Sequence, residues 1–148
     1  MDKSPKKSQP RTGILLHLYS LLIAGVACGL RLAAPFSKKV AQFLQNRGLS
    51  PTVLAELQTL AASGRQTVLF FCSSAGEFEQ AKPLIDRLCR QNQYAVHVLF
   101  FSESGIKYAV SRGEKLSYSK APLDTVWNWN RFFAALNPRY TFVIKYEL

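Results

Sequence analysis

The sequence predicts an α/β protein with a Rossmann-like parallel sheet, preceded by a membrane-associated helix. Short apolar runs at residues 67–72, 94–101 and 140–146 alternate with segments of helical spacing, as in parallel sheets. Small polar loops follow the first two runs. A long apolar run occupies residues 14–30 near the N-terminus. The 48% apolar composition is enough for a packed core.

The first strand–loop–helix unit spans residues 67–90. Its strand, residues 67–72, consists of β-branched, aromatic and other apolar residues, which suits burial on both faces. The small residues 73–76 can form a turn and cap a helix. Apolar residues at helical spacing then predict a helix over residues 77–90. Pro83 should kink this helix or mark the start of its regular part.

Glu77 follows the carboxyl end of this strand, which is where ligands bind in open α/β sheets. In the first turn of a helix, a carboxylate stays charged because unpaired N–H groups and the helix dipole favour the anion. Such a group suits a general base that takes a proton from a hydroxyl. It also suits an ordinary helix-capping acid, because acids are common in first turns. Spacing alone leaves both interpretations open.

The remaining elements repeat the pattern. Residues 37–64 form a helical connector, in which Ser50 and Pro51 open a helix over residues 51–60. Within the domain at residues 65–148, a loop from Ser102 to Gly105 leads into a helix at residues 106–112. A weak strand at 115–120 and a helix at 126–136 precede the last strand. His97 lies in a strand and is expected to be a core histidine. The aromatic residues of the 126–136 helix should be core, with part of them able to face a membrane: Trp127, Trp129, Phe132 and Phe133.

Residues 1–13 read as a disordered basic tail and residues 14–36 as a membrane-associated helix. The apolar run is near the lower length limit for crossing a bilayer, about 17–20 residues. It therefore suits a single span, a helix lying in the interface, or a cleaved signal peptide, although export would place a domain without a disulfide pair outside the cell. Basic residues flank both ends, so they do not select an orientation. Membrane attachment is expected and its depth stays open.

The charge and the cysteines limit the class of partner. Nineteen Lys and Arg against nine Asp and Glu give a net charge of +10, which indicates an anionic partner such as nucleic acid, phospholipid or phosphorylated glycolipid. The basic residues cluster in the tail and near the apolar run, which argues against nucleic acid. Cys28, Cys72 and Cys89 have no C-x-x-C spacing, and no metal-ligand or disulfide pattern is present. Cys72 and Cys89 are expected to be reduced core thiols.

Residues 73–85, S-S-A-G-E-F-E-Q-A-K-P-L-I, resemble the S-x-G-E…P-L-I signature of the Kdo (3-deoxy-D-manno-octulosonate) transferases. Four further segments are similar in the same order: F-F-S-E-S-G at 100–105, P-L-D-T at 122–125, R-F-F-A-A-L-N-P-R at 131–139 and V-I-K-Y-E-L at 143–148. The resemblance runs from about Leu15 to the last residue. It implies the acceptor-side half of a GT-B glycosyltransferase.

The resemblance also implies a function and a set of site residues. Kdo would pass from CMP-Kdo to a lipid A precursor at the cytoplasmic face of the inner membrane, with Glu77 as the general base. It places substrate-binding roles on Ser74, Gly76, Ser102, Ser104, Gly105, Lys145 and Glu147. Two positions depart from the family pattern. Phe71 replaces a histidine. Lys145 replaces the first acid of an E-T-E segment, although some members also have K-Y-E, and it would pair with an anionic substrate group.

No cofactor is implied beyond the donor, which a second domain absent from these residues would bind. The expected partners are membrane lipid, the lipid A precursor and that missing domain, with no nucleic acid. The 148 residues alone are therefore expected to be inactive. The alternative is a catalytically silent, membrane-attached remnant that binds acidic glycolipid or a partner chain.

Overall fold

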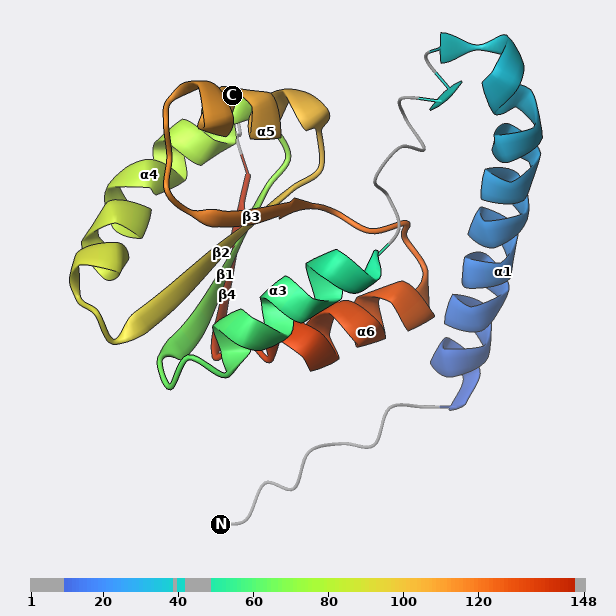
Figure 1. The fold of residues 1–148 in the computed structure, drawn as a ribbon. Coiled ribbons are helices and arrows are strands. Elements are labelled where there is room, and N and C mark those ends of the chain that lie inside the picture. The colour runs from blue at the N-terminus through green and yellow to red at the C-terminus, as the bar shows by residue number, and fades with distance from the viewer. Residues whose placement is uncertain (1–9, 39, 42–48, 146–148) are drawn as a thin grey trace.

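The computed structural model describes residues 10–38, 40–41 and 49–145, and these contain one four-stranded sheet. Its strands are β1 (Gln66–Cys72), β2 (Tyr94–Phe100), β3 (Ser117–Lys120) and β4 (Tyr140–Ile144). They run in the order β3-β2-β1-β4, and every pairing is parallel (Figure 1). The predicted fold class is confirmed.

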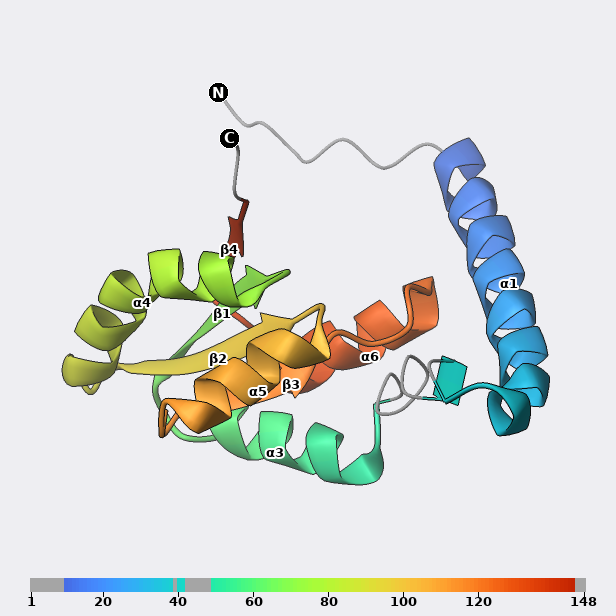
Figure 2. The same cartoon turned by 90° about the horizontal axis from the view of Figure 1, so that it is seen from above.

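Helices cover both faces of the sheet, because alternate residues of each strand point to opposite sides. Val68, Phe70 and Cys72 join a core with residues of α4 (Ala75–Arg90) and α5 (Glu103–Ser111). Leu69 joins the opposite core with residues of α3 (Pro51–Ala61) and α6 (Val126–Leu136). Figure 2 shows α4 and α3 on opposite sides of the sheet. The result is a three-layer domain.

Hydroxyl caps set where the helices begin. Ser50, Ser74, Ser102 and Thr125 are the N-caps of α3, α4, α5 and α6, and each side chain accepts a backbone N–H three residues on. Helix α4 therefore begins at Ala75, two residues before the predicted start at residue 77. Helix α5 begins at Glu103, so the prediction that Ser104 and Gly105 lie in a loop is wrong. They belong to the first helical turn.

Several other predictions are corrected. Helix α4 is regular before and after Pro83, so Pro83 does not mark its start. β2 ends at Phe100, and β3 begins at Ser117. Cys89 is exposed and is not a core thiol, whereas Cys72 is buried.

The α6 aromatics are mixed, since Phe132 is fully buried while Trp127 and Phe133 are 39% and 41% exposed. Only part of the aromatic set is therefore core. His97 is a core residue, as expected, at 1% exposure.

The N-terminal helix α1 (Pro10–Ala33) continues into a short 3-10 turn, η1 (Ala34–Phe36). It starts before the expected boundary at Ile14, so the last residues of the predicted tail are helical. The stretch Gly13–Phe36 is long and apolar enough to cross a membrane. Figure 1 shows α1 beside the domain, near the start of α6. The expected tail at residues 1–9 and the connector at residues 42–48 lie outside the described residues.

Candidate active site at the carboxyl edge of the sheet

The carboxyl ends of β1, β2 and β4 meet at one edge of the sheet. Cys72, the last residue of β1, pairs with Phe100 at the end of β2 and with Ile144 at the end of β4. The Phe101 N–H also donates to the Cys72 carbonyl at 3.1 Å. The chain connects β1 to β2 on one side and reaches β4 on the other, so the strand order reverses between β1 and β4. Ligands bind in open α/β sheets at such a reversal.

Glu77 lies at this reversal and is held at both its backbone and its side chain. Its N–H donates to Ser74 Oγ at 3.3 Å, and its carboxylate Oε2 accepts the N–H of Ser73. The side chain is 8% exposed. This reciprocal arrangement is close to a capping box, in which a helix-start hydroxyl and an acid three residues on satisfy each other's neighbouring N–H groups. The capping interpretation is therefore confirmed.

The capping contact does not use the whole carboxylate. Oε2 is held by Ser73, which fixes the position of the carboxyl group and leaves Oε1 as the atom that could take a proton. The negative charge also acts on its neighbour. Burial raises the pKa of the Cys72 thiol to about 12, and the Glu77 charge adds to that rise. Cys72 is consequently a neutral, inert thiol beneath the site. A catalytic role for Glu77 stays a prediction.

The other candidate residues fall into two groups. Lys145 directly follows Ile144 and so lies next to the loop of Ser73 and Glu77 across the β1–β4 pair. Gly76 has open space beside it: if a Cβ were added at this position, its nearest neighbour would be Ser74 Oγ at 3.9 Å. Ser74 contributes to this group as the N-cap of α4. Glu147 lies outside the described residues, so its predicted role is not placed.

The second group lies at the start of α5. Ser102 Oγ accepts the N–H of Gly105 at 3.3 Å and lies 3.0 Å from Ser104 Oγ. Gly105 packs against the core, because a Cβ there would lie 2.4 Å from Cδ1 of Phe100. Packing against Phe100 therefore requires a glycine at position 105. Substrate-binding roles for Ser102, Ser104 and Gly105 stay predictions.

Sequence reasoning missed an ion-pair cluster beside this group. Lys120, at the end of β3, has a side chain only 7% exposed, and its Nζ lies 3.6 Å from Glu103. Glu103 also pairs with Lys107 at 3.1 Å, and this hydrogen bond and charge lower the pKa of Glu103. These three charged groups line a cavity of about 600 Å³, together with residues just before α3 and in α3, α5 and β3: Leu49, Ser50, Val53, Ile106, Tyr118 and Ser119. Spacing gave no signal for it, since its members are far apart in the sequence.

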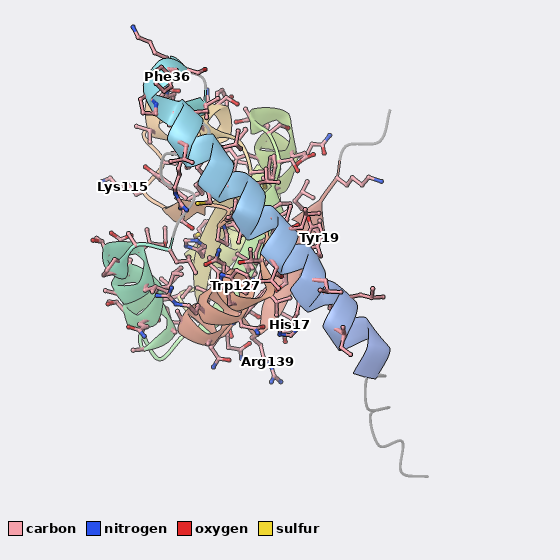
Figure 3. The ribbon with its side chains drawn as sticks, turned by 90° about the vertical axis from the view of Figure 1, so that its right-hand side faces the viewer. His17, Tyr19, Phe36, Lys115, Trp127 and Arg139 are labelled. Atoms are coloured by element: carbon pink, nitrogen blue, oxygen red, sulfur yellow. The ribbon has the colours of Figure 1, made fainter. Side chains whose placement is uncertain are left out.

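The P-L-D-T segment has a structural role that the sequence did not show. Asp124 accepts the Tyr19 hydroxyl of α1 at 2.8 Å and the Trp129 indole N–H at 2.8 Å. Ser20 Oγ accepts the N–H of Val126 at 2.9 Å. Figure 3 shows α1 lying across this side of the domain, with Tyr19 labelled on it and Trp127 of α6 behind. The segment joins α1 to the start of α6.

His97 has no catalytic geometry. Its two ring nitrogens lie 2.8 and 2.9 Å from the hydroxyls of Ser117 and Ser119. Burial lowers its pKa to about 3, so the ring is neutral. Among the described residues, no group of three or more His, Cys, Asp and Glu side chains could hold a metal ion.

Comparison with known proteins agrees with the motif resemblance. The model of the 3-Deoxy-D-manno-octulosonic-acid transferase (kdotransferase) family matches residues 41–148. No curated protein and no solved structure matches the chain. The match covers more than half of the sequence and includes the whole sheet and Glu77. The chain therefore belongs to the Kdo transferase family, of which it contains the N-terminal domain.

Proposed function

We propose that this chain is the acceptor-side domain of a glycosyltransferase that moves Kdo from CMP-Kdo onto a lipid A precursor. Family membership supports Kdo transfer. The observation that supports the site is the position of Glu77 at the strand-order reversal, with one carboxylate oxygen fixed by Ser73. A positioned carboxylate at a ligand-binding edge is what a general base requires.

The proposed step uses Glu77 Oε1 as the proton acceptor. An acceptor sugar hydroxyl loses its proton to Glu77 while its oxygen attacks the anomeric carbon of Kdo. The new carbon–oxygen bond forms as the bond from that carbon to the CMP phosphate breaks, and CMP leaves with the electron pair. The N–H of Ser73 keeps the carboxylate in place throughout. Because Glu77 is nearly buried, few water molecules compete with the acceptor hydroxyl for the carboxylate oxygen.

Lys145 brings a positive charge to the same edge of the sheet. It follows β4 and lies across the β1–β4 pair from the Glu77 loop. An acceptor with phosphate groups and a donor with a carboxylate both bring negative charge to this edge. We expect Lys145 to bind one of these anionic groups. Ser102 and Ser104 would supply hydroxyl donors from the neighbouring loop.

The donor is expected to bind mainly to a second, nucleotide-sugar-binding domain. The 148 residues alone should therefore show no turnover of CMP-Kdo. The test is a hybrid enzyme that joins this chain to the donor-binding domain of an active family member. We expect it to transfer radiolabelled Kdo to a lipid A precursor, and the unjoined chain to give no product.

A silent, glycolipid-binding remnant is the second candidate, and the capping role of Glu77 favours it because a cap alone explains the residue. A folded hybrid that binds the acceptor without forming product would support this candidate and contradict catalysis. Transfer by the unjoined chain would contradict the assignment of donor binding to the other domain. We place the enzyme at the cytoplasmic face of the inner membrane, attached through α1.

A further inference from the structure

We propose that α1 lies flat in the membrane interface, fastened to the domain, and does not cross the bilayer. This inference deepens the membrane attachment proposed above and rests on it. Its basis is the pair of contacts that join the middle of α1 to the carboxyl edge of the sheet: Tyr19 with Asp124, and Ser20 with Val126. Ser20 is fully buried, and so is most of Ala27 two turns along the helix.

The length of α1 after Ser20 is too short for the helix to cross the bilayer while these two contacts are kept. The rise from Ser20 to Ala33, the last residue of α1, is about 20 Å at 1.5 Å per residue. The hydrocarbon core of a bilayer is about 30 Å thick. If the domain emerged after Ala33, the contacts at Ser20 would draw Asp124 and the start of α6 about 20 Å into hydrocarbon. Asp124 carries a carboxylate, which is strongly disfavoured there.

The side chains of α1 also divide into two sides. At 3.6 residues per turn, His17, Tyr19 and Arg31 lie within about 100° of Ser20 around the helix, in an arc that also holds apolar residues such as Ile23 and Ala27. Between Gly13 and Ala33, the opposite side is apolar and exposed. Its large members include Leu15, Leu18, Leu22 and Leu32, which are 67%, 57%, 65% and 76% exposed. The large side chains directed away from Ser20 are therefore apolar, and lipid is a suitable surrounding for them.

The outward side fits lipid better than another protein surface. Figure 3 views this side, with Phe36 near one end of α1 and His17 toward the other. The basic residues Arg31 and Lys38 near the C-terminal end of α1 match the anionic headgroups of a cytoplasmic leaflet. Because Asp124 and Val126 follow β3 at the carboxyl edge, the membrane would lie beside the edge that holds Glu77. A lipid acceptor could then reach the site without leaving the bilayer surface.

Sealed vesicles of both orientations test this arrangement. The background is Cys28→Ser with Cys89→Ser, which leaves only the buried Cys72. Ser4→Cys reports the tail before α1, and Ser63→Cys reports the domain from an exposed turn. Each is treated with a membrane-impermeant maleimide, and permeabilised vesicles give the full labelling level. We expect both thiols to label from the same side of the membrane, and neither from the other side.

Labelling of the two thiols from opposite sides would overturn the proposal, because α1 would then cross the bilayer. Pelleting is measured on the same samples. A protein that stays soluble would contradict membrane attachment itself, whereas a pelleted protein with opposite-side labelling would contradict only the flat placement. In the same Cys28→Ser, Cys89→Ser background, efficient cross-linking between two copies through Leu22→Cys at low protein-to-lipid ratio would show that a second copy covers the outward side, which also overturns it. None of these readouts depends on Kdo transfer.

Discussion

Substituting Gly105 tests whether packing or substrate binding requires this glycine. In Gly105→Ala, the new Cβ would lie 2.4 Å from Cδ1 and 3.0 Å from Cε1 of Phe100, against an ordinary contact of about 3.5–4.0 Å. Phe100 is fully buried and packs on Phe78 at a ring-centroid distance of 5.4 Å, so it cannot move freely. Overpacking of this kind costs about 1–3 kcal/mol. Alanine recovers up to about 1 kcal/mol of helix propensity, so the net loss should be about 1–2 kcal/mol.

Gly76→Ala is the matched control, because it makes the same change in the first turn of α4. There the nearest atom would be 3.9 Å away, so no clash opposes the gain in helix propensity. We expect stabilisation of about 0.5–1 kcal/mol. Urea unfolding in one detergent should therefore separate the two midpoints by about 1 M, with Gly105→Ala lower. Equal midpoints would refute the packing argument. A hybrid with Gly76→Ala that is stable but slow would instead support an acceptor-facing role for Gly76.

Three further predictions concern ionisation and membrane attachment. Burial lowers the pKa of His97 to about 3, against about 6.5 in the unfolded chain, so the unfolded state binds the extra proton. The free energy of unfolding should therefore fall by about 1.4 kcal/mol per pH unit as the pH drops below 6.5. Urea titrations of His97→Gln should show a smaller dependence of this free energy on pH. An unchanged slope in the mutant would contradict the prediction. Cys28 and Cys89 should react with a thiol reagent at pH 8 in the folded protein while Cys72 does not, because a thiol of pKa about 12 is only about 0.01% ionised there; mass spectrometry showing three labels would contradict this. Deleting residues 1–36 should move the chain to the soluble fraction, and a deleted form that still pellets and resists high salt would place the anchor elsewhere.

The bounds of helices and strands could be predicted from the sequence where the residues next to an element determine its ends. The helix at 126–136 matches α6 in both bounds, because Thr125 before it and Asn137 after it are strong end signals. The starts of α4 and α5 were misplaced, since a hydroxyl cap can precede the apolar spacing by several residues. Glu77 could be placed because a strand end and a helix start are both local.

The spacing of residues could not predict contacts between residues that are far apart in the sequence. Tyr19 and Asp124 are 105 positions apart, and only the fold brings them within a hydrogen bond. The Glu103–Lys120 pair likewise depends on the β2–β3 register. The role of Gly105 depends on the position of one buried ring, which no glycine pattern encodes. The exposure of Cys89 depends on which side of α4 meets the sheet, and its apolar neighbours in sequence gave the wrong side.

The rate of Glu77→Gln in the hybrid enzyme tests the central claim most directly, measured beside Glu79→Gln, the same change two residues on at the exposed surface of α4. Glutamine keeps the size of the side chain and can still accept the Ser73 N–H, but it cannot take a proton from the acceptor. We expect Kdo transfer to fall by about 10²–10⁴-fold in Glu77→Gln with acceptor binding nearly unchanged, and Glu79→Gln to stay close to wild type. A Glu77→Gln enzyme that loses only about 1 kcal/mol of stability and keeps its rate would show that Glu77 is a helix cap and not the base.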